Sequence, residues 1–528
     1  MKLNVPEEVA GVAQTLVKSG FQAYLVGGCV RDVLIERVPK DWDIATDAKP
    51  EEILRLFPDS VYENNFGTVG VKVENKGQRT ENEGQRTKDL RQRTEVVEVT
   101  TFRKEGKYTD KRHPDSIVFA KTIEEDLARR DFTINAMALN MGTSDVLKTS
   151  DVQTLLVDPY GGREDLEKKL IRTVGRAEER FGEDALRLMR AVRFAVELSA
   201  GGRSGSDEPS GSMSGPASGW GIEEKTAAAI LKLSNSLKEI AMERIRDEFQ
   251  KVIMADEAMK GVQMLEDLGL LKHIITELRD GIGCGQNLHH IYSVWEHNVR
   301  ALDYAAKQGY GLEIRLAALL HDIGKPKTKR GDGKNSTFYG HEVVGARMAK
   351  AIMERLRFSK EITDMVTHLV RHHLFYYNVG EVSEAGVRRF LARVGPENID
   401  DLVKIREADR IGSGVPKAKP YKIRHLLFMI DKVRRDPLSP KMLKVNGEDV
   451  MKILGISPGP RIGWILSALM DEVLEEPSRN KIKDLGFRIK ELGKLSDKEL
   501  QGLAKKGKEK IAEEEAGIEG EMKRKHHV

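Results

Sequence analysis

A glycine pair between a short strand and a helix, with two aspartates at the next strand, most constrains how this chain can fold. AYLVGG at 23–28 reads as a buried strand that ends in the glycines, and VRDVLIER at 30–37 has the spacing of a helix. WDIAT at 42–46 reads as the following strand. This alternation predicts a sheet flanked by helices at the N-terminus.

Asp41 and Asp43 would lie on one face of that second strand, about 6 to 7 Å apart. At an effective dielectric of about 20, two such charges repel by roughly 2 to 3 kcal/mol. A divalent cation between them removes the repulsion, and carboxylate oxygens suit Mg²⁺. An Asp-x-Asp pair by itself is more often a solvated strand edge or turn, so the surrounding motifs must carry the assignment.

The glycine pair supplies the first of those motifs. In LVGGCVRD at 25–32, Gly28 stands at the strand-to-helix turn and Arg31 follows one helical turn later. Exposed backbone N–H groups, a helix N-terminus and a guanidinium together form a cradle for a triphosphate. The aspartates arrive 13 residues later, on the strand that would face the phosphates.

Composition sets limits on the rest of the chain. Its 528 residues are enough for about three or four domains. Lys+Arg 87 against Asp+Glu 83 gives a net charge of only +4, so any basic surface for nucleic acid must be local. Cys29 and Cys284 offer no disulfide framework or zinc spacing, and no secretory signal or long apolar run occurs. We therefore expect a cytoplasmic protein with no membrane partner.

Two segments read as insertions. The first, at 75–95, repeats Gln-Arg-Thr between the strand-like TVGVKV and VVEVTTF, and it predicts a polar extension of a hairpin. The second, at 200–221, consists mostly of Gly, Ser and Pro and predicts a flexible linker. After residue 500 the chain is charged and poorly periodic, which predicts a frayed end.

Five motifs in one order resemble a known family. They are LVGGCVRD, KDWDIATD, DLARRDFTINAMAL, DPYGGREDL and EDALRLMRAVRFA. Together they resemble the head and neck of class II tRNA nucleotidyltransferases, the bacterial CCA-adding enzymes, and of the related bacterial poly(A) polymerases. The resemblance implies an α+β fold: a polymerase-β-like nucleotidyltransferase head with a mixed sheet, followed by an all-α neck, HD or body region, and tail. It also implies two Mg²⁺ ions at Asp41 and Asp43, with tRNA, CTP and ATP as partners.

The RRDFTINA motif adds two candidate nucleotide-binding residues. Arg130 is a planar donor suited to phosphate, and Asp131 is an acceptor suited to a ribose hydroxyl. Asn135 would brace them. A helix cap with a solvated arginine pair is an equally good interpretation of this motif alone.

In the EDALRLMRAVRFA motif, Asp184, Arg187, Arg190 and Arg193 recur at intervals of three along a predicted helix. Asp184 and Arg187 would be neighbours, and a carboxylate beside a guanidinium can match the hydrogen-bonding edge of a base. In the family that the chain resembles, the matching positions select C or A without a template. Arg190 and Arg193 would hold phosphates or the fold. A surface salt bridge is the competing interpretation.

One loop bears on which member of the family this is. Residues 101–127, TFRKEGKYTDKRHPDSIVFAKTIEEDL, resemble the loop with which CCA-adding enzymes switch from C to A. The extra arginine-rich stretch of the related poly(A) polymerases is missing from NNFGTVGVKVE at 64–74. The resemblance therefore favours CCA addition, with poly(A) polymerase as the alternative.

A second set of motifs lies downstream. Four residues resemble the metal-binding motif of HD phosphohydrolases: His297, His321, Asp322 and Asp409. Three further histidines could complete a second metal site: His341, His372 and His373. Imidazole with carboxylate suits Mn²⁺, Fe²⁺, Ni²⁺ or Zn²⁺. A degenerate HD fold without metal is the alternative, and an HD phosphohydrolase with an RNA-binding N-terminal half is a rival for the whole chain.

These motifs divide the chain into four expected domains. They are a nucleotidyltransferase head at 1–148, a nucleotide-selecting helical neck at 149–275, an HD-type helical domain at 276–425, and a tRNA-binding body and tail at 426–528. In the last of these, residues 445–477 resemble the C-terminal body of the same family, and the resemblance implies that Gly and Pro in SPGPRIG would let the backbone approach RNA phosphate at a helix N-terminus. A non-catalytic RNA-binding scaffold would not need the carboxylate pair together with the glycine turn.

Overall fold

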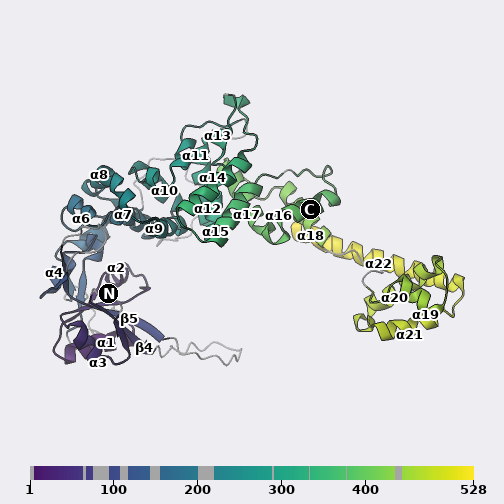
Figure 1. The fold of residues 1–528 in the computed structure, drawn as a ribbon, viewed down its shortest axis with the longest axis horizontal. Helices are drawn as coiled ribbons and strands as arrows, with labels where there is room; N and C mark the ends of the chain where they lie inside the picture. The colour runs from purple at the N-terminus through teal and green to yellow at the C-terminus, as the bar shows by residue number, and fades with distance from the viewer. Residues whose placement is uncertain are drawn as a thin grey trace. The chain divides into compact units, whose positions relative to one another are not determined.

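A computed structural model describes most of the chain (Figure 1). The described residues are 5–62, 67–74, 94–106, 117–142, 155–199, 219–287, 291–331, 333–375, 377–434 and 443–527. By their internal contacts they form two compact units: Met1–His373 with Ala408–Val415, and Leu374–Glu407 with Pro416–Val528.

The N-terminal part of the first unit is built on a mixed seven-stranded sheet. In sheet order the strands are β3 (Ser60–Tyr62), β4 (Thr68–Glu74), β5 (Thr94–Thr101), β2 (Asp43–Thr46), β1 (Ala23–Val26), β8 (Ala138–Asn140) and β9 (Leu156–Val157). β2 and β5 are parallel, with Asp43 opposite Glu98, and the other pairs are antiparallel. The sheet with its helices, shown in purple and blue in Figure 1, confirms the predicted fold class.

Short helices surround this sheet, and the same part of the chain contains a separate two-stranded ribbon. They are α1 (Glu7–Lys18), α2 (Gly28–Leu34), α3 (Pro50–Leu56) and α4 (Ile123–Leu127), with β6 (Arg103–Glu105) and β7 (Ile117–Phe119). The whole of β1 is buried, and α2 starts directly after Gly27, whose φ is 76°. Glycine adopts that conformation without strain, which makes the sharp strand-to-helix turn possible.

The structure corrects the predicted position of the first aspartate. β2 begins only at Asp43. Asp41 therefore lies two residues before the strand and not on it, as was predicted for both aspartates. The chain bends at Lys40 and Asp41, directly after Pro39, which has no N–H to donate to a ladder. The predicted hairpin strands at 68–73 and 96–102 are confirmed as the antiparallel pair β4 and β5.

The rest of the first unit is helical apart from the two-stranded β10 (Leu170–Ile171) and β11 (Gly221–Ile222). After the sheet come α5 (Gly162–Glu167), α6 (Ala177–Glu183), α7 (Leu186–Glu197), α8 (Glu224–Leu233), α9 (Met242–Met254) and α10 (Ala258–Asp267). Then follow α11 (Val294–Lys307), α12 (Leu312–Leu320), α13 (Lys325–Thr328), α14 (His341–Arg355), α15 (Lys360–His372) and the end of α17 (Ile399–Gly412).

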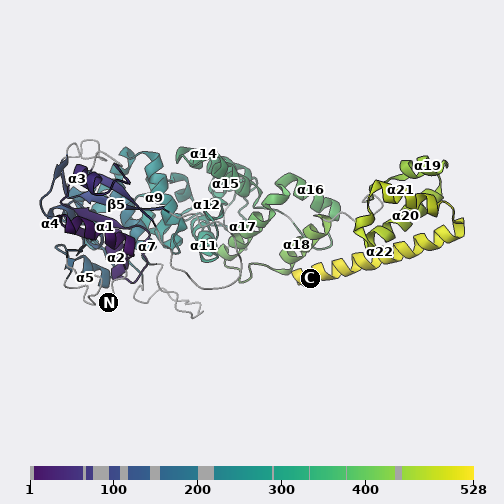
Figure 2. The same ribbon diagram turned by 90° about the horizontal axis from the view of Figure 1, so that it is seen from below.

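The second unit is entirely helical in its described part. It holds α16 (Glu384–Val394), the start of α17, α18 (Tyr421–Arg434), α19 (Gly447–Leu454), α20 (Pro460–Glu475), α21 (Ile482–Leu492) and α22 (Asp497–His526). α19 to α22 enclose an apolar cluster that includes Val450, Ile465, Leu469, Leu485 and Leu500. Figure 2 shows α22 as the long yellow helix beside α20.

The predicted frayed end is wrong, because α22 continues to His526. Ser496 and Glu499 form a capping box at its start. Near its end, Lys525 Nζ and His526 Nε2 each lie 2.8 Å from a carboxylate oxygen of Asp431 on α18. Capping and ion pairs therefore hold a helix whose sequence has little apolar periodicity.

The predicted insertions lie mainly outside the described residues. Residues 75–93 of the first are not described, and its last two residues belong to β5. Of the second, only residues 219–221 are described. They pack into the fold, so the prediction of a flexible linker is wrong for these three residues. Trp220 is only 4% exposed, and its carbonyl accepts a hydrogen bond from Lys260 Nζ at 2.9 Å. Burial of the indole fixes this end of the segment.

Among the described helices, none combines the length and the apolar character that crossing a bilayer requires.

Candidate active site and metal centre

The strand-to-helix turn brings three predicted site groups together. A Cβ atom at Gly27 would lie 2.7 Å from Arg130 Nη1 and 3.6 Å from Asp43 Oδ2. Only a residue without a side chain leaves room for this guanidinium at the turn. The turn, the guanidinium and the carboxylate therefore lie close together. Gly27 and Gly28, at the N-terminus of α2, line the same space.

This volume opens into a cleft of about 1160 Å³ between the sheet and the neck helices α7 and α9. Every residue that the sequence marks for catalysis or nucleotide binding lines it: Gly28, Arg31, Asp41, Asp43, Arg130, Asp131, Asp184, Arg187, Arg190 and Arg193. The fold thus collects residues from four sequence motifs over more than 150 positions. A cleft of this size can take a nucleoside triphosphate together with an RNA end.

The carboxylate pair has the electrostatics of a cation site. Burial raises the pKa of the Asp43 carboxyl; the Arg130 charge opposes this shift, and the Asp41 charge adds to it. Asp41 itself is exposed to the cleft. A divalent cation bound by both oxygen donors would neutralise the pair, so the two residues fit Mg²⁺ by their chemistry.

Two arginines are held at the cleft by side-chain contacts. Arg31 Nη1 donates to Asn135 Oδ1 at 2.8 Å, and Arg31 Nε donates to Asp32 Oδ1 at 2.8 Å. Arg130 Nη2 donates to Asp126 Oδ2 at 3.3 Å, while its buried Nε has no hydrogen-bond partner in the described part of the chain. Fixed guanidiniums beside a glycine turn are suited to phosphate oxygens.

Asp131 is more tightly engaged than the sequence suggests. Its Oδ1 accepts from the Phe132 amide at 2.8 Å and from Asn135 Nδ2 at 3.2 Å, and its Oδ2 accepts from Arg190 Nε at 2.8 Å. Burial alone would raise the pKa of this carboxyl, but Arg190 and Arg187 hold it far below its usual range. Asp131 therefore orders the floor of the cleft, with Asn135 bracing it.

The helix that carries the base-selecting candidates begins later than predicted. Asp184 is the C-cap residue of α6, and α7 starts at Leu186, so the four motif residues do not share one helix. Arg187 Nη1 donates to Glu183 Oε2 at 2.5 Å. Asp184 Oδ2 instead accepts from Arg244 Nη2 at 2.7 Å. The two candidates are neighbours along the chain, but each pairs with a different side chain.

Arg244 on α9 is a cleft residue that the sequence analysis missed. It lies 60 positions from Asp184, and no local spacing connects the two. Arg193 is 7% exposed, and its Nη1 donates to Glu248 Oε1 on the same helix α9 at 2.9 Å. Of the two roles predicted for Arg193, this contact supports holding the fold. Two ion pairs thus tie the start and the middle of the α7 segment to α9.

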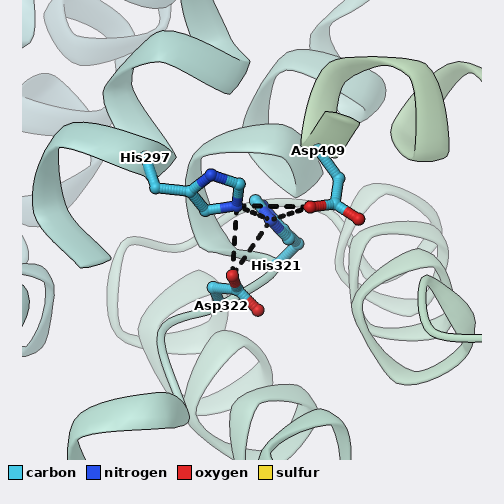
Figure 3. Close-up of side chains that lie close together, drawn as sticks. All are labelled: His297, His321, Asp322 and Asp409. Atoms are coloured by element: carbon cyan, nitrogen blue, oxygen red, sulfur yellow. Dashed lines mark hydrogen bonds and ion pairs between the residues drawn. The ribbon is translucent and has the colours of Figure 1, made fainter. Parts of the chain in front are cut away.

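The HD motif forms a compact cluster (Figure 3). His297 from α11 and His321 at the end of α12 point their Nε2 atoms at each other, 2.8 Å apart. His297 Nε2 lies 3.1 Å from Asp322 Oδ2 and 3.4 Å from Asp409 Oδ1. One ligand atom from each of the four residues falls within 4.8 Å of the others.

Backbone carbonyls set the orientation of the histidine rings. The Nδ1 atoms of His321, His341 and His373 lie 2.7 to 2.8 Å from the carbonyl oxygens of Ala318, Phe338 and Val370. A ring that donates from Nδ1 presents the Nε2 lone pair inward, as metal-binding histidines do. The donor set and its second contacts therefore fit a divalent transition metal.

A second group shares Asp322 with the first. Asp322, His341 and His373 also bring their ligand atoms within 4.8 Å, and Asp322 Oδ1 lies 3.3 Å from His341 Nε2. The predicted third histidine of this group, His372, is not part of it. Its ring lies beside that of His368, with 4.6 Å between centroids and a tilt of 53°. Consecutive helix positions such as 372 and 373 point to different sides.

Charge inside the cluster is strongly coupled. Burial alone would lower the pKa of His321, but the carboxylates of Asp322 and Asp409 raise it to about 10. Burial opposes the ionisation of Asp322, and Lys325 and His321 nevertheless hold its pKa well below the usual range. Lys325 Nζ lies 2.5 Å from Asp322 Oδ2 and donates to Gln286 Oε1 at 2.6 Å. Sequence spacing did not reveal Gln286.

Comparison with known families assigns three segments. Residues 23–172 match the family described as "Poly A polymerase head domain", and residues 219–281 match "Probable RNA and SrmB- binding site of polymerase A". Residues 294–412 match "HD domain". A mixed sheet that carries a glycine turn and a carboxylate pair beside a helical neck thus defines a nucleotidyltransferase of the poly(A) polymerase head class, here with an HD region.

Individual relatives specify the family. The chain is 38% identical to the "CCA-adding enzyme" of Bacillus cytotoxicus over 93% of its own length and 99% of that enzyme. It is 37% identical to the CCA-adding enzyme of Geobacillus kaustophilus, but this match spans only 54% of that enzyme's length. The chain belongs to the family of bacterial CCA-adding enzymes, tRNA nucleotidyltransferases that use divalent cations.

Two further relatives bear on function. An "A-adding tRNA nucleotidyltransferase" of Deinococcus radiodurans is 32% identical over 68% of this chain and 76% of the relative. Among solved structures, the Bacillus stearothermophilus CCA-adding enzyme in complex with CTP is 26% identical and matches 92% of this chain and 96% of that chain, with a TM-score of 0.53.

Proposed function

We propose that this chain adds or repairs the 3′-terminal CCA of tRNA, using CTP and ATP and no template. The observation that carries the proposal is the placement of Asp41 and Asp43 in one cleft with the Gly27 turn and Arg130, in a member of this family. Mg²⁺ is the proposed metal of this pair, because both donors are hard carboxylate oxygens.

Each group in the cleft has a proposed task. Asp41 and Asp43 would hold the metal, which would supply neutralisation of the negative charge that develops when the RNA 3′-hydroxyl attacks the α-phosphate and pyrophosphate leaves. The backbone N–H groups at Gly28 and the guanidiniums of Arg31 and Arg130 bind the triphosphate. Because these donors are already oriented, they lose little freedom when the phosphates bind.

Base selection falls to the junction of α6 and α7, where Asp184 follows the end of α6 and Arg187 stands in the first turn of α7. We assign it to Asp184 and Arg187, which line the cleft and offer an acceptor and a donor to the edge of the base. Asp131, Arg190 and Arg193 support this junction through ion pairs, in which Asp131 and Arg193 are buried and Arg190 is half-buried. Arg244 orients Asp184.

The test uses three forms of one tRNA, which end at position 73, 74 or 75, with labelled CTP or ATP and Mg²⁺. A CCA-adding enzyme completes all three, and it adds A only after the second C. An enzyme that extends only the third form with A would be an A-adding enzyme, as the similarity to the Deinococcus radiodurans protein allows. A long run of A on all three would indicate poly(A) polymerase. Each of these two outcomes would overturn CCA addition.

A second activity is proposed for the HD cluster. Because its four ligand atoms lie within 4.8 Å and its histidines present Nε2 inward, we assign it a divalent metal from Mn²⁺, Fe²⁺, Ni²⁺ and Zn²⁺. The proposed reaction is hydrolysis of a phosphoester or cyclic phosphate at a damaged RNA 3′ end, which would prepare that end for nucleotide addition.

The metal is tested by elemental analysis of the purified chain, and the reaction by incubation with RNA that ends in a 2′,3′-cyclic phosphate. A stoichiometric metal with cyclic-phosphate opening is expected. A metal-free and inactive HD region, after incubation with each of the four ions, would leave the degenerate fold as the correct interpretation.

The four predicted segments remain our proposed division of labour: head at 1–148, neck at 149–275, HD-type domain at 276–425, and a tRNA-binding body and tail at 426–528. The cytoplasm, where tRNA ends are matured, is the proposed location.

A further inference from the structure

A second pocket lies within the second unit, between α16 and α18, which pack against each other. Its volume is about 360 Å³. Its walls are apolar or aromatic except for two arginines, and the lining residues are Phe375, Tyr377, Val382, Gly386, Val387, Arg389, Phe390, Arg393 and Leu426. The volume is at the lower end of the range for small-ligand sites and suits one nucleotide unit.

The aromatic walls are fixed in place. The rings of Phe375 and Phe390 lie 5.2 Å apart between centroids, at 48° to each other. The Tyr377 hydroxyl and His425 Nδ1 are hydrogen-bonded at 2.6 Å, which restrains the tyrosine ring at the pocket. Both phenylalanines and the tyrosine are partly exposed to solvent, so a planar group can reach their faces.

The two arginines carry charge that no ion pair with a described residue neutralises. Arg389 and Arg393 are exposed, and neither forms an ion pair or a hydrogen bond with any described residue. The nearest acidic side chain of α16, Glu384, is already paired with Arg388 and with Lys432, at 3.3 and 3.4 Å. Among the described residues, no carboxylate lines the pocket. The site therefore offers π faces beside two uncompensated guanidiniums.

We propose that this pocket binds one unpaired nucleotide of the RNA substrate, with the base stacked on Phe390 and Phe375 and the flanking phosphates held by Arg389 and Arg393. Aromatic faces with adjacent arginines are the means by which proteins hold single-stranded bases. A base is planar and a phosphate is anionic, so the nucleotide matches both halves of the site. The inference rests on the proposed function in so far as the RNA is tRNA.

The experiment measures the dissociation constant of the full chain for a tRNA that lacks its CCA end. The double variant Arg389→Gln/Arg393→Gln is expected to weaken binding about tenfold and to reduce the slope of log K against log salt by about one to two. Phe390→Ala is expected to weaken binding about tenfold through lost stacking, and Phe390→Trp should restore it. The KM for CTP should stay as in the wild type.

Arg388→Gln is the matched control. It removes a charge from the same helix, but Arg388 is paired with Glu384 and does not line the pocket. A fully paired RNA duplex is the matched ligand, and its binding should be equal in the wild type and the Phe390 variants. Thermal melting of each variant checks that it folds as the wild type does.

Several outcomes would overturn the proposal. They are tRNA affinity unchanged in the double variant, an equal loss in Arg388→Gln, and quenching of the Phe390→Trp fluorescence by free AMP or CMP but not by tRNA. Protection of the pocket by a protein partner instead of RNA would do so too. If the wild type binds tRNA through this pocket yet adds no nucleotide, the pocket stands and the proposed CCA addition fails.

Discussion

The cleft of the head and neck and the HD cluster both contain several carboxylates, but different side chains compensate their negative charge. In the cleft, guanidiniums oppose several of the acidic groups: Asp131 faces Arg190, and Asp184 faces Arg244. In the HD cluster, histidines and aspartates converge on one point, and the pKa of His321 rises to about 10. The cleft is therefore suited to a large polyanion, whose phosphates its arginines can bind. The HD cluster is suited to a single metal ion.

The largest expected effect comes from a change in the cleft that should leave the HD cluster active. Asp43→Asn keeps the shape of the side chain but removes a cation ligand, so nucleotide addition should fall at least about a thousandfold. Binding of tRNA should persist, and so should cyclic-phosphate opening at the HD cluster. The measurement is single-turnover extension of a tRNA that lacks CCA. Turnover close to the wild-type rate in both Asp43→Asn and Asp41→Asn would refute the assigned metal pair.

The converse change is Asp322→Ala. Asp322 contributes to both groups of ligands, so bound metal and phosphoester hydrolysis should both be lost. Nucleotide addition should change by no more than about twofold, because the cleft contacts are untouched. Asp303→Ala on α11 is the matched control, since Asp303 pairs only with Lys307 at the surface in the described contacts. A collapse of nucleotide addition in folded Asp322→Ala would show that the two regions are not independent.

A smaller effect is expected on nucleotide choice. Asp184→Ala or Arg187→Ala should raise UTP or GTP incorporation relative to CTP and ATP by about tenfold or more, because a matched polar contact to the base is lost. Arg244→Gln should do the same more weakly, since it frees Asp184 without removing it. Sequencing of the extended tRNA ends measures the effect.

Arg246→Gln on the same helix is the control, because Arg246 pairs with Asp247 and does not line the cleft. If C, C, A order is unchanged in folded Asp184→Ala and Arg187→Ala, the junction of α6 and α7 is structural and the base is read elsewhere.

The elements that position the sites could be predicted from the sequence where a local rule applies. Apolar runs located β1 and β2, and the glycine pair located the turn between β1 and α2, because only a few residue types permit that backbone. The four HD residues were found by motif, and the structure brings them within 4.8 Å.

What the sequence did not reveal depends on contacts between distant segments. Arg244 meets Asp184 across 60 positions, and Lys325 meets Gln286 across 39. The helix α22 was missed for a different reason: its Lys and Glu residues favour a helix through capping and charge pairs, without the apolar stripe on which pattern recognition relies. Trp220 was assigned to a linker because its neighbours are Gly, Ser and Pro.

The smallest effect concerns stability and acid, and it tests whether the ion pairs of the cleft serve the fold. The pKa of Asp131 is lower in the folded chain than its ordinary value of 3.8. Its carboxylate therefore stabilises the fold fully at pH values above 3.8, and this contribution is lost as the pH falls from 3.8 toward the folded pKa. Asp131→Asn lacks the charge and leaves Arg190 without its carboxylate. The first unfolding transition of Asp131→Asn on heating should therefore have a midpoint about 5 °C below that of the wild type at pH 7. The gap should narrow as pH is lowered below 3.8, because the carboxyl of the unfolded wild-type chain then takes up a proton while the folded one stays ionised, which removes the advantage of the wild type. Asp247→Asn, at the surface of α9, is the matched control for the loss of a carboxylate. A gap in Asp131→Asn that stays constant down to strongly acidic pH would mean that the shape of the side chain, and not its charge, holds the floor of the cleft.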